Sequence, residues 1–281
     1  MKSAVVIPNS GKDKDLQVTS DVFKKLISIG FQVYIENDLA YKFSGSIGYS
    51  LFPEDADVII VVGGDGTVLD ASGYAIKYDI PLLCVNLGKV GYLSEIEPDM
   101  LDLLDRLMTG DFTVSEKMLL EIASVNLIDE AHKYAVNDIV ISHESYLGIA
   151  NLKLVDSVGN SIKYRADGVI LATPQGSTAY SLSAGGPIVA HDVGGIIATP
   201  ICAHSFFDRS VIFNAFETIT VTNISDDALN ISVDGRYVSA LSSDSSCIIK
   251  CADKKLKMIS FSRNSMFSNL FKKMKMLEDT E

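Results

Sequence analysis

Residues 58–69 read Val-Ile-Ile-Val-Val-Gly-Gly-Asp-Gly-Thr-Val-Leu. The apolar run predicts a strand buried on both faces of a parallel sheet. The glycines after it predict a turn, and the residues beyond predict a helix that ends at about Tyr78. Glycines let an anion approach the main chain, and the first amides of a helix favour negative charge. The segment therefore predicts a phosphate-binding loop that contains no lysine.

Asp65 stands inside this predicted loop. A carboxylate beside a phosphate is repelled unless it serves the reaction. It can accept a proton from an attacking hydroxyl, or help to hold the Mg²⁺ that accompanies the phosphates. The alternative is that Asp65 and Thr67 only cap the helix. Because Gly-Gly-Asp-Gly-Thr arises by chance in fewer than ~1 in 1,000 chains of this length, the phosphate site is favoured.

Strands and helices alternate in the first part of the chain. Apolar runs that end in loops predict strands, and apolar residues at helical spacing predict the helices between them. This repeated order is typical of an open parallel sheet, so we expect an α/β domain over residues 1–112. Besides the helix after the glycine loop, the expected strands and helices cover residues 4–7, 31–35, 57–62 and 81–85, and residues 15–29 and 98–108, respectively.

Strand patterns dominate after residue 112, and turn signals separate them. We expect a second domain over residues 113–258 that is larger and mostly antiparallel β. Residues 259–281 form an amphipathic tail that we expect to dock back on the body. The expected strands of the second domain cover residues 118–127, 135–142, 149–155, 168–172, 218–221, 231–233 and 247–251.

The composition narrows the class of protein. The chain has 281 residues, 24 Lys and Arg and 36 Asp and Glu, so its net charge is 24 − 36 = −12. This acidity argues against nucleic-acid binding, which needs many cations. No apolar run reaches the roughly 20 residues of a membrane span, and no signal peptide is recognised, so we expect a cytoplasmic protein without a membrane partner. Cys84 and Cys202 lie in apolar runs and are expected in the core.

Several familiar motifs are missing. Leu69 stands where a dinucleotide-binding fingerprint needs its third glycine. Gly11-Lys12 lacks the upstream glycine and the following Ser or Thr of a P-loop. The four cysteines and four histidines show no metal-ligand spacing, so no protein metal site is expected.

The glycine loop resembles a motif shared by NAD kinases, diacylglycerol-type lipid kinases and, more distantly, phosphofructokinases. Later segments resemble the NAD kinase family specifically. They are Val-Asn-Leu-Gly-Lys-Val-Gly-Tyr-Leu at residues 85–93, Asn137-Asp138, and Tyr-Arg-Ala-Asp-Gly at 164–168 with Thr-Pro-Gln-Gly-Ser-Thr-Ala-Tyr-Ser at 173–181. Pro187, His204-Ser205 and Asp234-Gly235-Arg236 follow in the family's order. The resemblance covers about residues 58–236.

The resemblance implies an NAD kinase, which phosphorylates the adenosine ribose 2′-hydroxyl of NAD⁺ to give NADP⁺. ATP with Mg²⁺ is the expected phosphoryl donor, with polyphosphate as an alternative, and the expected assembly is a homodimer or homotetramer. Asp65 would be the catalytic base, and Gly63, Gly64, Gly66 and Thr67 would bind phosphates. The implied NAD-binding residues are Tyr92, Asn137, Asp138, Arg165, Asp167, Thr178, Ala179, Tyr180 and Ser183.

The chemistry of these side chains suits a nucleotide without reference to the family. Asn137 offers a donor and an acceptor for an adenine edge, and Asp138 can accept hydrogen bonds from a ribose diol. The hydroxyls of residues 176–183 suit sugar and phosphate. Arg165 can pair with a phosphate, or form a surface ion pair instead.

The sequence departs from the family pattern at two places and is compatible with two other functions. Gln175 stands where the family usually has Ser, and residues 206–210 depart from the family pattern. A lipid or other small-alcohol kinase would share the glycine loop but leave the hydroxyl-rich segment unexplained. A non-catalytic NAD(P) sensor would bind the dinucleotide without turnover.

Overall fold

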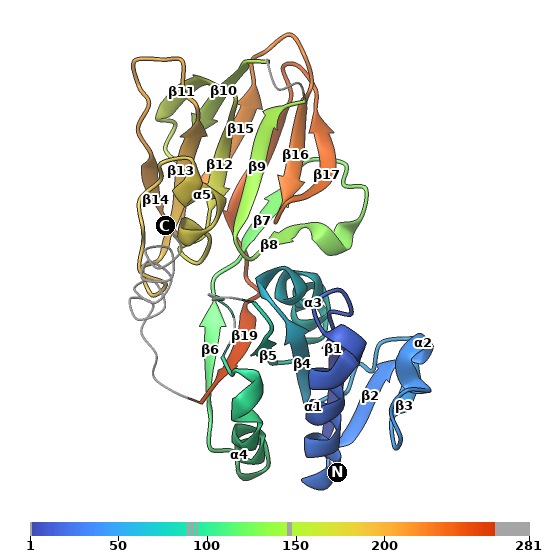
Figure 1. Ribbon diagram of the computed structural model, residues 1–281. Coiled ribbons are helices and arrows are strands. Elements are labelled where there is room, and N and C mark those ends of the chain that lie inside the picture. The colour runs from blue at the N-terminus through green and yellow to red at the C-terminus, as the bar shows by residue number, and fades with distance from the viewer. Residues whose placement is uncertain (1, 89–90, 92, 94, 145–147, 262–281) are drawn as a thin grey trace, which may run out of the picture. The chain divides into compact units, whose positions relative to one another are not determined.

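The computed structural model describes residues 2–88, 91, 93, 95–144 and 148–261. The chain divides into two compact units (Figure 1). The first unit combines Met1–Glu116 with Leu256–Glu281, and the second is Lys117–Lys255. Each unit is described separately below.

The first unit is built on a seven-stranded sheet in the order β3-β2-β1-β4-β5-β19-β6. Neighbouring strands from β3 through β19 run parallel. Gly63 of β4 pairs with Asn86 of β5, so these two strands end at the same edge of the sheet. The strands are β1 (Ser3–Pro8), β2 (Gln32–Glu36), β3 (Ile47–Tyr49), β4 (Val58–Gly63), β5 (Leu82–Asn86), β6 (Thr113–Lys117) and β19 (Leu256–Ser260).

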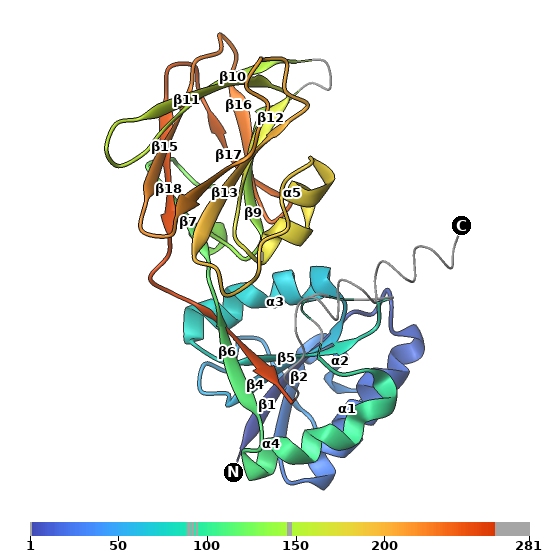
Figure 2. The ribbon, with the colours of Figure 1, turned by 90° about the vertical axis from the view of Figure 1, so that its left-hand side faces the viewer.

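Helices cover both faces of this sheet (Figure 2). On one face, α1 and α4 bury Phe23, Leu26 and Leu107 against alternate residues of the strands. On the other face lies α3, which contacts β4 and β5. The helical elements are η1 (Lys14–Leu16), α1 (Gln17–Ser28), α2 (Asn37–Ala40), α3 (Asp65–Tyr78), η2 (Pro98–Leu104) and α4 (Asp105–Thr109). The expected α/β domain with a parallel sheet is confirmed.

The second unit contains two antiparallel six-stranded sheets, in the orders β11-β10-β15-β18-β7-β8 and β14-β13-β12-β9-β16-β17. This confirms the expected antiparallel β architecture. Its elements are β7 (Leu120–Ala123), η3 (Glu130–His132), β8 (Tyr134–Ala135), β9 (Asp138–His143), β10 (Ala150–Val155), β11 (Ser161–Ala166), β12 (Gly168–Ala172), η4 (Gly176–Thr178), α5 (Tyr180–Ser183), β13 (Gly195–Ile201), β14 (Val211–Asn214), β15 (Thr218–Asn223), β16 (Leu229–Val233), β17 (Arg236–Leu241) and β18 (Ser246–Cys251).

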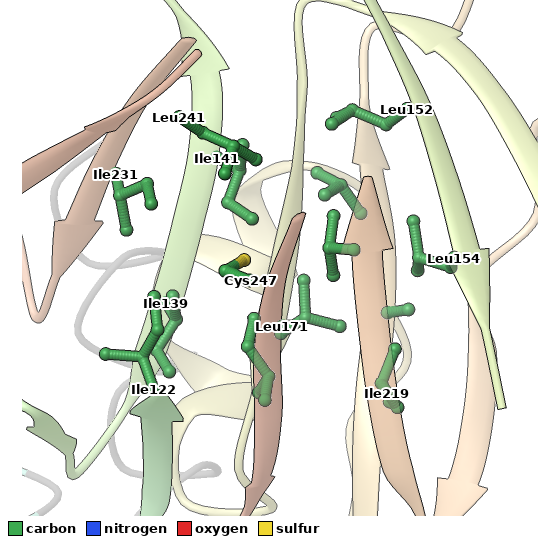
Figure 3. Close-up of a cluster of buried hydrophobic side chains, with 14 of the residues drawn as sticks. Ile122, Ile139, Ile141, Leu152, Leu154, Leu171, Ile219, Ile231, Leu241 and Cys247 are labelled. Carbon is green, nitrogen blue, oxygen red and sulfur yellow. The ribbon is translucent and has the colours of Figure 1, made fainter. Parts of the chain in front are cut away.

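The two sheets of the second unit share one apolar core (Figure 3). Ile139 and Leu171 come from one sheet, and Leu152 and Ile219 come from the other. The strand β12 is buried along its whole length, because a smaller cluster that includes Ile170 covers its other side. This strand is therefore a rigid support for the loops at both of its ends.

Some local expectations need correction. Cys202 is exposed rather than in the core, because it follows the end of β13 with a positive φ of 47°. Within the expected strand 118–127 only Leu120–Ala123 is a strand, since Ser124 turns the chain with a φ of 64°. The predicted tail at residues 259–281 lies almost entirely outside the described residues. None of the described helices is long and apolar enough to cross a membrane.

Candidate active site

The glycine loop joins β4 to α3 directly. Gly64 is the N-cap residue of α3, and no side chain makes a capping hydrogen bond there, so neither Asp65 nor Thr67 is the N-cap. A Cβ on Gly63 would stand 2.5 Å from Thr67 Oγ1, which is closer than side-chain atoms approach. Glycine at position 63 is therefore a steric requirement of the turn.

Thr67 ties this loop to the first strand. Its buried hydroxyl accepts a hydrogen bond of 2.8 Å from Asn9 Nδ2, and Asn9 follows β1 directly. The main-chain amide of Asn9 also donates to Val62 O at 2.8 Å. The loops after β1 and β4 are thus held together at the carboxyl edge of the sheet, where ligands of open α/β sheets bind.

Asp65 is half-buried in the first turn of α3. Its carboxylate accepts a hydrogen bond of 3.2 Å from the amide of Leu93. Leu93 belongs to the second motif segment, 85–93, so the fold brings these two motifs together. Tyr92, which the sequence predicts as an NAD contact, lies outside the described residues.

Asn86 anchors the second motif to the glycine loop. It is buried at the end of β5, and the next amide, that of Leu87, donates to Gly63 O at 2.7 Å. The Asn86 side chain donates to Glu97 Oε1 at 3.0 Å and accepts from Gly88 N at 2.9 Å. Asn86 is part of the motif at residues 85–93, but the sequence alone predicts no role for its side chain.

In the second unit, Asp234 organises the Asn137–Asp138 segment. Its carboxylate accepts hydrogen bonds from three consecutive amides, those of Val136 at 2.8 Å, Asn137 at 2.8 Å and Asp138 at 3.1 Å. Asp234 and Gly235 both have positive φ, 47° and 80°, and form the turn between β16 and β17. The sequence places Asp234-Gly235 in the family's order of motifs, but the hydrogen bond from the amide of Asn137 to Asp234 is visible only in the structure.

The Thr173–Gly176 segment closes over the same residues. Thr173 donates from its amide to Asn137 O at 2.8 Å and from its hydroxyl to Val136 O at 2.7 Å. A Cβ on Gly176 would stand 2.0 Å from Asn137 O, so only glycine permits this approach. Two motifs 36 or more residues apart therefore form one rigid substructure.

Burial and, to a lesser extent, the negative charge of Asp234 together raise the pKa of Asp138 to about 7. Burial also raises the pKa of Asp234, while its three amide donors lower it. Two neighbouring carboxyl groups thus have different environments. The net shift of the Asp234 pKa is upward, although its three amide donors favour the charged form, and Asp138 takes up a proton near neutral pH.

The remaining residues of this motif differ in exposure. Thr178 is buried and donates to Gln175 O at 3.2 Å, Ala179 is half-buried, and Tyr180 and Ser183 are exposed. Gln175 is only 4% exposed, and its Oε1 has no hydrogen-bond partner among the described residues.

Arg165 and Asp167 lie elsewhere in the unit. Asp167 Oδ1 is 3.4 Å from His204 Nε2, and the amide of His204 donates to Arg165 O at 2.7 Å. These residues lie at the Gly168 end of β12, whereas Asn137 and Thr173 lie at its Ala172 end. Four strand steps separate the two ends, which is roughly 13 Å. The predicted NAD-binding residues of this unit therefore form two separate groups.

The described residues contain no group of three or more His, Cys, Asp or Glu side chains that could hold a metal ion.

Comparisons with known proteins extend these observations. The family description "ATP-NAD kinase N-terminal domain" matches residues 5–112, and "ATP-NAD kinase C-terminal domain" matches residues 136–261. An NAD kinase of Natranaerobius thermophilus is 34% identical over 280 residues, covering 98% of each chain.

Two solved structures share the fold. One is an NAD kinase from Archaeoglobus fulgidus in complex with ATP, with a TM-score of 0.77 and 23% identity, covering 98% of this chain and 99% of that one. The other is yeast NADH kinase complexed with NADH, with a TM-score of 0.83 and 22% identity, covering 96% of this chain and 86% of that one. The resemblance drawn from the motifs is confirmed: the chain belongs to the ATP-NAD kinase family.

Proposed function

We propose that this chain transfers the terminal phosphoryl group of ATP to the 2′-hydroxyl of the adenosine ribose of NAD⁺, with Asp65 as the catalytic base. The observation that carries this assignment is the place of Asp65. Its carboxylate stands in the first turn of α3, beside amides that favour phosphate, and is held by the amide of Leu93. A carboxylate at this position would repel a bound phosphate, so a role in activating the reacting hydroxyl explains Asp65 better than a role in stabilising the fold.

In the reaction, the 2′-oxygen forms a bond to the γ-phosphorus as the bond to the β-phosphate oxygen breaks. ADP leaves, and the proton of the hydroxyl passes to Asp65 and then to solvent. Gly63, Gly64, Gly66 and Thr67 bind the phosphates. Little covalent work falls to the protein, so positioning and charge stabilisation supply most of the acceleration.

The second unit supplies the dinucleotide contacts. Asn137 binds the adenine edge and Asp138 accepts from the ribose diol, both held by Asp234. Thr178 and Ala179 line the adenosine, and the exposed ring of Tyr180 stacks on a base. Ser183 contributes a hydroxyl at the rim.

Mg²⁺ fits this arrangement as a companion of ATP. Asp65 offers one carboxylate, and the phosphates and water supply the other ligands, which is how Mg²⁺ is usually bound. When bound, the ion neutralises charge that develops on the transferred phosphoryl group. NAD⁺, ATP and Mg²⁺ are all abundant in the cytoplasm, and we propose that the enzyme acts there.

Arg165 and Asp167 are proposed to act across a subunit boundary. They lie at the opposite end of β12 from Asn137, roughly 13 Å away, while the exposed Tyr180 follows the Asn137 group. A homodimer or homotetramer in which one copy lends Arg165 and Asp167 to the dinucleotide of another copy uses both groups.

An endpoint assay tests the proposal. The purified protein is incubated with NAD⁺, Mg²⁺ and either ATP or polyphosphate, and an NADP-specific dehydrogenase detects the product. Asp65→Asn is compared with Asp70→Asn, which changes an exposed carboxylate five residues further along α3. We expect product with ATP, loss of kcat by orders of magnitude in Asp65→Asn and near-normal kcat in Asp70→Asn.

Other outcomes select the alternatives. Product with polyphosphate alone keeps the acceptor and changes the donor. NAD⁺ binding without product in either tube favours a dinucleotide sensor. Absence of both, with phosphorylation of lipid vesicles, favours a lipid kinase.

A further inference from the structure

The segment after β1 is tightly anchored beside the glycine loop. Asn9 Oδ1 accepts from the amides of Gly11 and Lys12, each at 3.1 Å, while Asn9 Nδ2 holds Thr67. The next residue, Asp13, is buried, and its carboxylate accepts from the amides of Val18 at 3.0 Å and Thr19 at 2.8 Å. Lys12 therefore projects from a backbone that is fixed on both sides.

The ammonium group of Lys12 lies over the glycine loop. A Cβ on Gly64 would stand 2.9 Å from Lys12 Nζ. Gly64 is the N-cap residue of α3, so a full positive charge adds to the partial charge of the helix N-terminus.

A phosphate bound at the glycine loop would be stabilised by a positive charge close to it. The loop carries the carboxylate of Asp65 and has no lysine or arginine of its own. ATP brings about four further negative charges to an acidic protein, and Lys is a common point-charge ligand for phosphate. Gly11-Lys12 lacks the P-loop pattern in sequence, yet the fold carries Lys12 to a phosphate loop that is 51 or more residues away.

We propose that Lys12 is a phosphate-binding residue of this site, with its ammonium on a non-bridging oxygen of a phosphate held at Gly63–Thr67. This inference rests on the proposed function of the loop. The phosphate belongs either to the triphosphate of ATP or to the diphosphate of NAD⁺. The alternative role for Lys12 is only to balance Asp65 within the fold.

The test compares Lys12→Met and Lys12→Arg with Lys14→Met, a matched control at an exposed lysine two residues along. For each variant, KM for ATP, KM for NAD⁺, kcat, the thermal midpoint and the inhibition constant of inorganic triphosphate are measured. Loss of one charge-assisted contact predicts an increase of about tenfold or more in KM for ATP and in the inhibition constant, in Lys12→Met alone. Lys12→Arg keeps the charge and should stay within about threefold of wild type.

Each outcome of these measurements either supports or overturns the role proposed for Lys12. An increase in KM for NAD⁺ instead assigns the phosphate to the dinucleotide and still supports the contact. If Lys12→Met matches Lys14→Met in both KM values and in triphosphate inhibition, the proposal is overturned, as it is if only the thermal midpoint falls. If wild type makes no NADP⁺, the proposed function fails by itself. Calorimetry with inorganic triphosphate on wild type and Lys12→Met then tests Lys12 separately.

Discussion

Asp234 accepts a hydrogen bond from the amide of Asn137 at 2.8 Å, although 97 positions separate them in the chain. The same carboxylate holds the amides on either side of Asn137. These three hydrogen bonds come from main-chain amides and not from the side chains of Asn137 and Asp138. Asp234 is therefore a positioning residue, because it fixes the backbone that carries Asn137 and Asp138, the two residues that we propose to bind the nucleotide.

Asp234→Ala should lower stability and weaken NAD⁺ binding. Three partly buried amides lose their acceptor, so the free energy of unfolding should fall by about 2–4 kcal/mol. Asp234→Asn keeps one acceptor oxygen and tolerates the positive φ, so it should lose less. Thermal unfolding and KM for NAD⁺ measure the effects, with the exposed Asp226→Asn as the control. A change in kcat with unaltered KM for NAD⁺ would contradict a positioning role.

Asp138→Asn should change how stability depends on pH. The folded pKa of Asp138 is about 7, above the ordinary 3.8, so the protonated form is favoured by folding. Its contribution is fully present below pH ~4 and is lost as pH rises through about 7. Between pH 5 and pH 8, the free energy of unfolding of Asp138→Asn should therefore rise by on the order of 1–3 kcal/mol relative to that of wild type.

Thermal midpoints of wild type and Asp138→Asn at several pH values test this prediction. The exposed Asp226→Asn serves again as the control variant. A constant difference between Asp138→Asn and wild type would sink the idea that Asp138 titrates in the folded protein near pH 7.

Gly176→Ala and Gly73→Ala should shift stability in opposite directions. The new Cβ at position 176 meets Asn137 O at 2.0 Å, so the backbone must move, at a cost of about 2 kcal/mol or more. A Cβ at position 73, inside α3, meets nothing within 4 Å. Gly73→Ala should therefore raise the free energy of unfolding by about 0.5–1 kcal/mol. Thermal unfolding distinguishes the two, and equal midpoints would refute the steric role of Gly176.

Mixed oligomers should test whether Asp167 acts in another copy's site. Asp65→Asn and Asp167→Ala are each expected to be inactive alone. When the two variants are co-expressed and form dimers, half of the dimers contain one copy of each variant. In each mixed dimer, one of the two sites combines wild-type Asp65 with wild-type Asp167. About a quarter of wild-type activity should return. If Asp167 serves its own copy, every site stays defective and no activity returns.

Contiguous residues are enough to predict the first half of the candidate site. The apolar run of β4 shows burial on both faces, and Gly63–Thr67 shows a turn into a helix, because periodicity and glycine content are local properties. The later motifs identify the family for the same reason. The sequence does not predict strands β11 and β13, because β11 is polar at every second residue and β13 contains Pro200, which is atypical of an inner strand.

The contacts that hold the site together depend on tertiary structure. Asn9 meets Thr67 across 58 positions, Asp234 meets Asn137 across 97, and Lys12 reaches Gly64. Strand β19, residues 256–260, completes the sheet of the first unit beside β5. Strand order and register decide such encounters, and neither is encoded in the local pattern of one segment. The chemistry of each motif can therefore be predicted from the sequence, whereas the residues that orient each motif are known only from the tertiary structure, because the sheets bring them together.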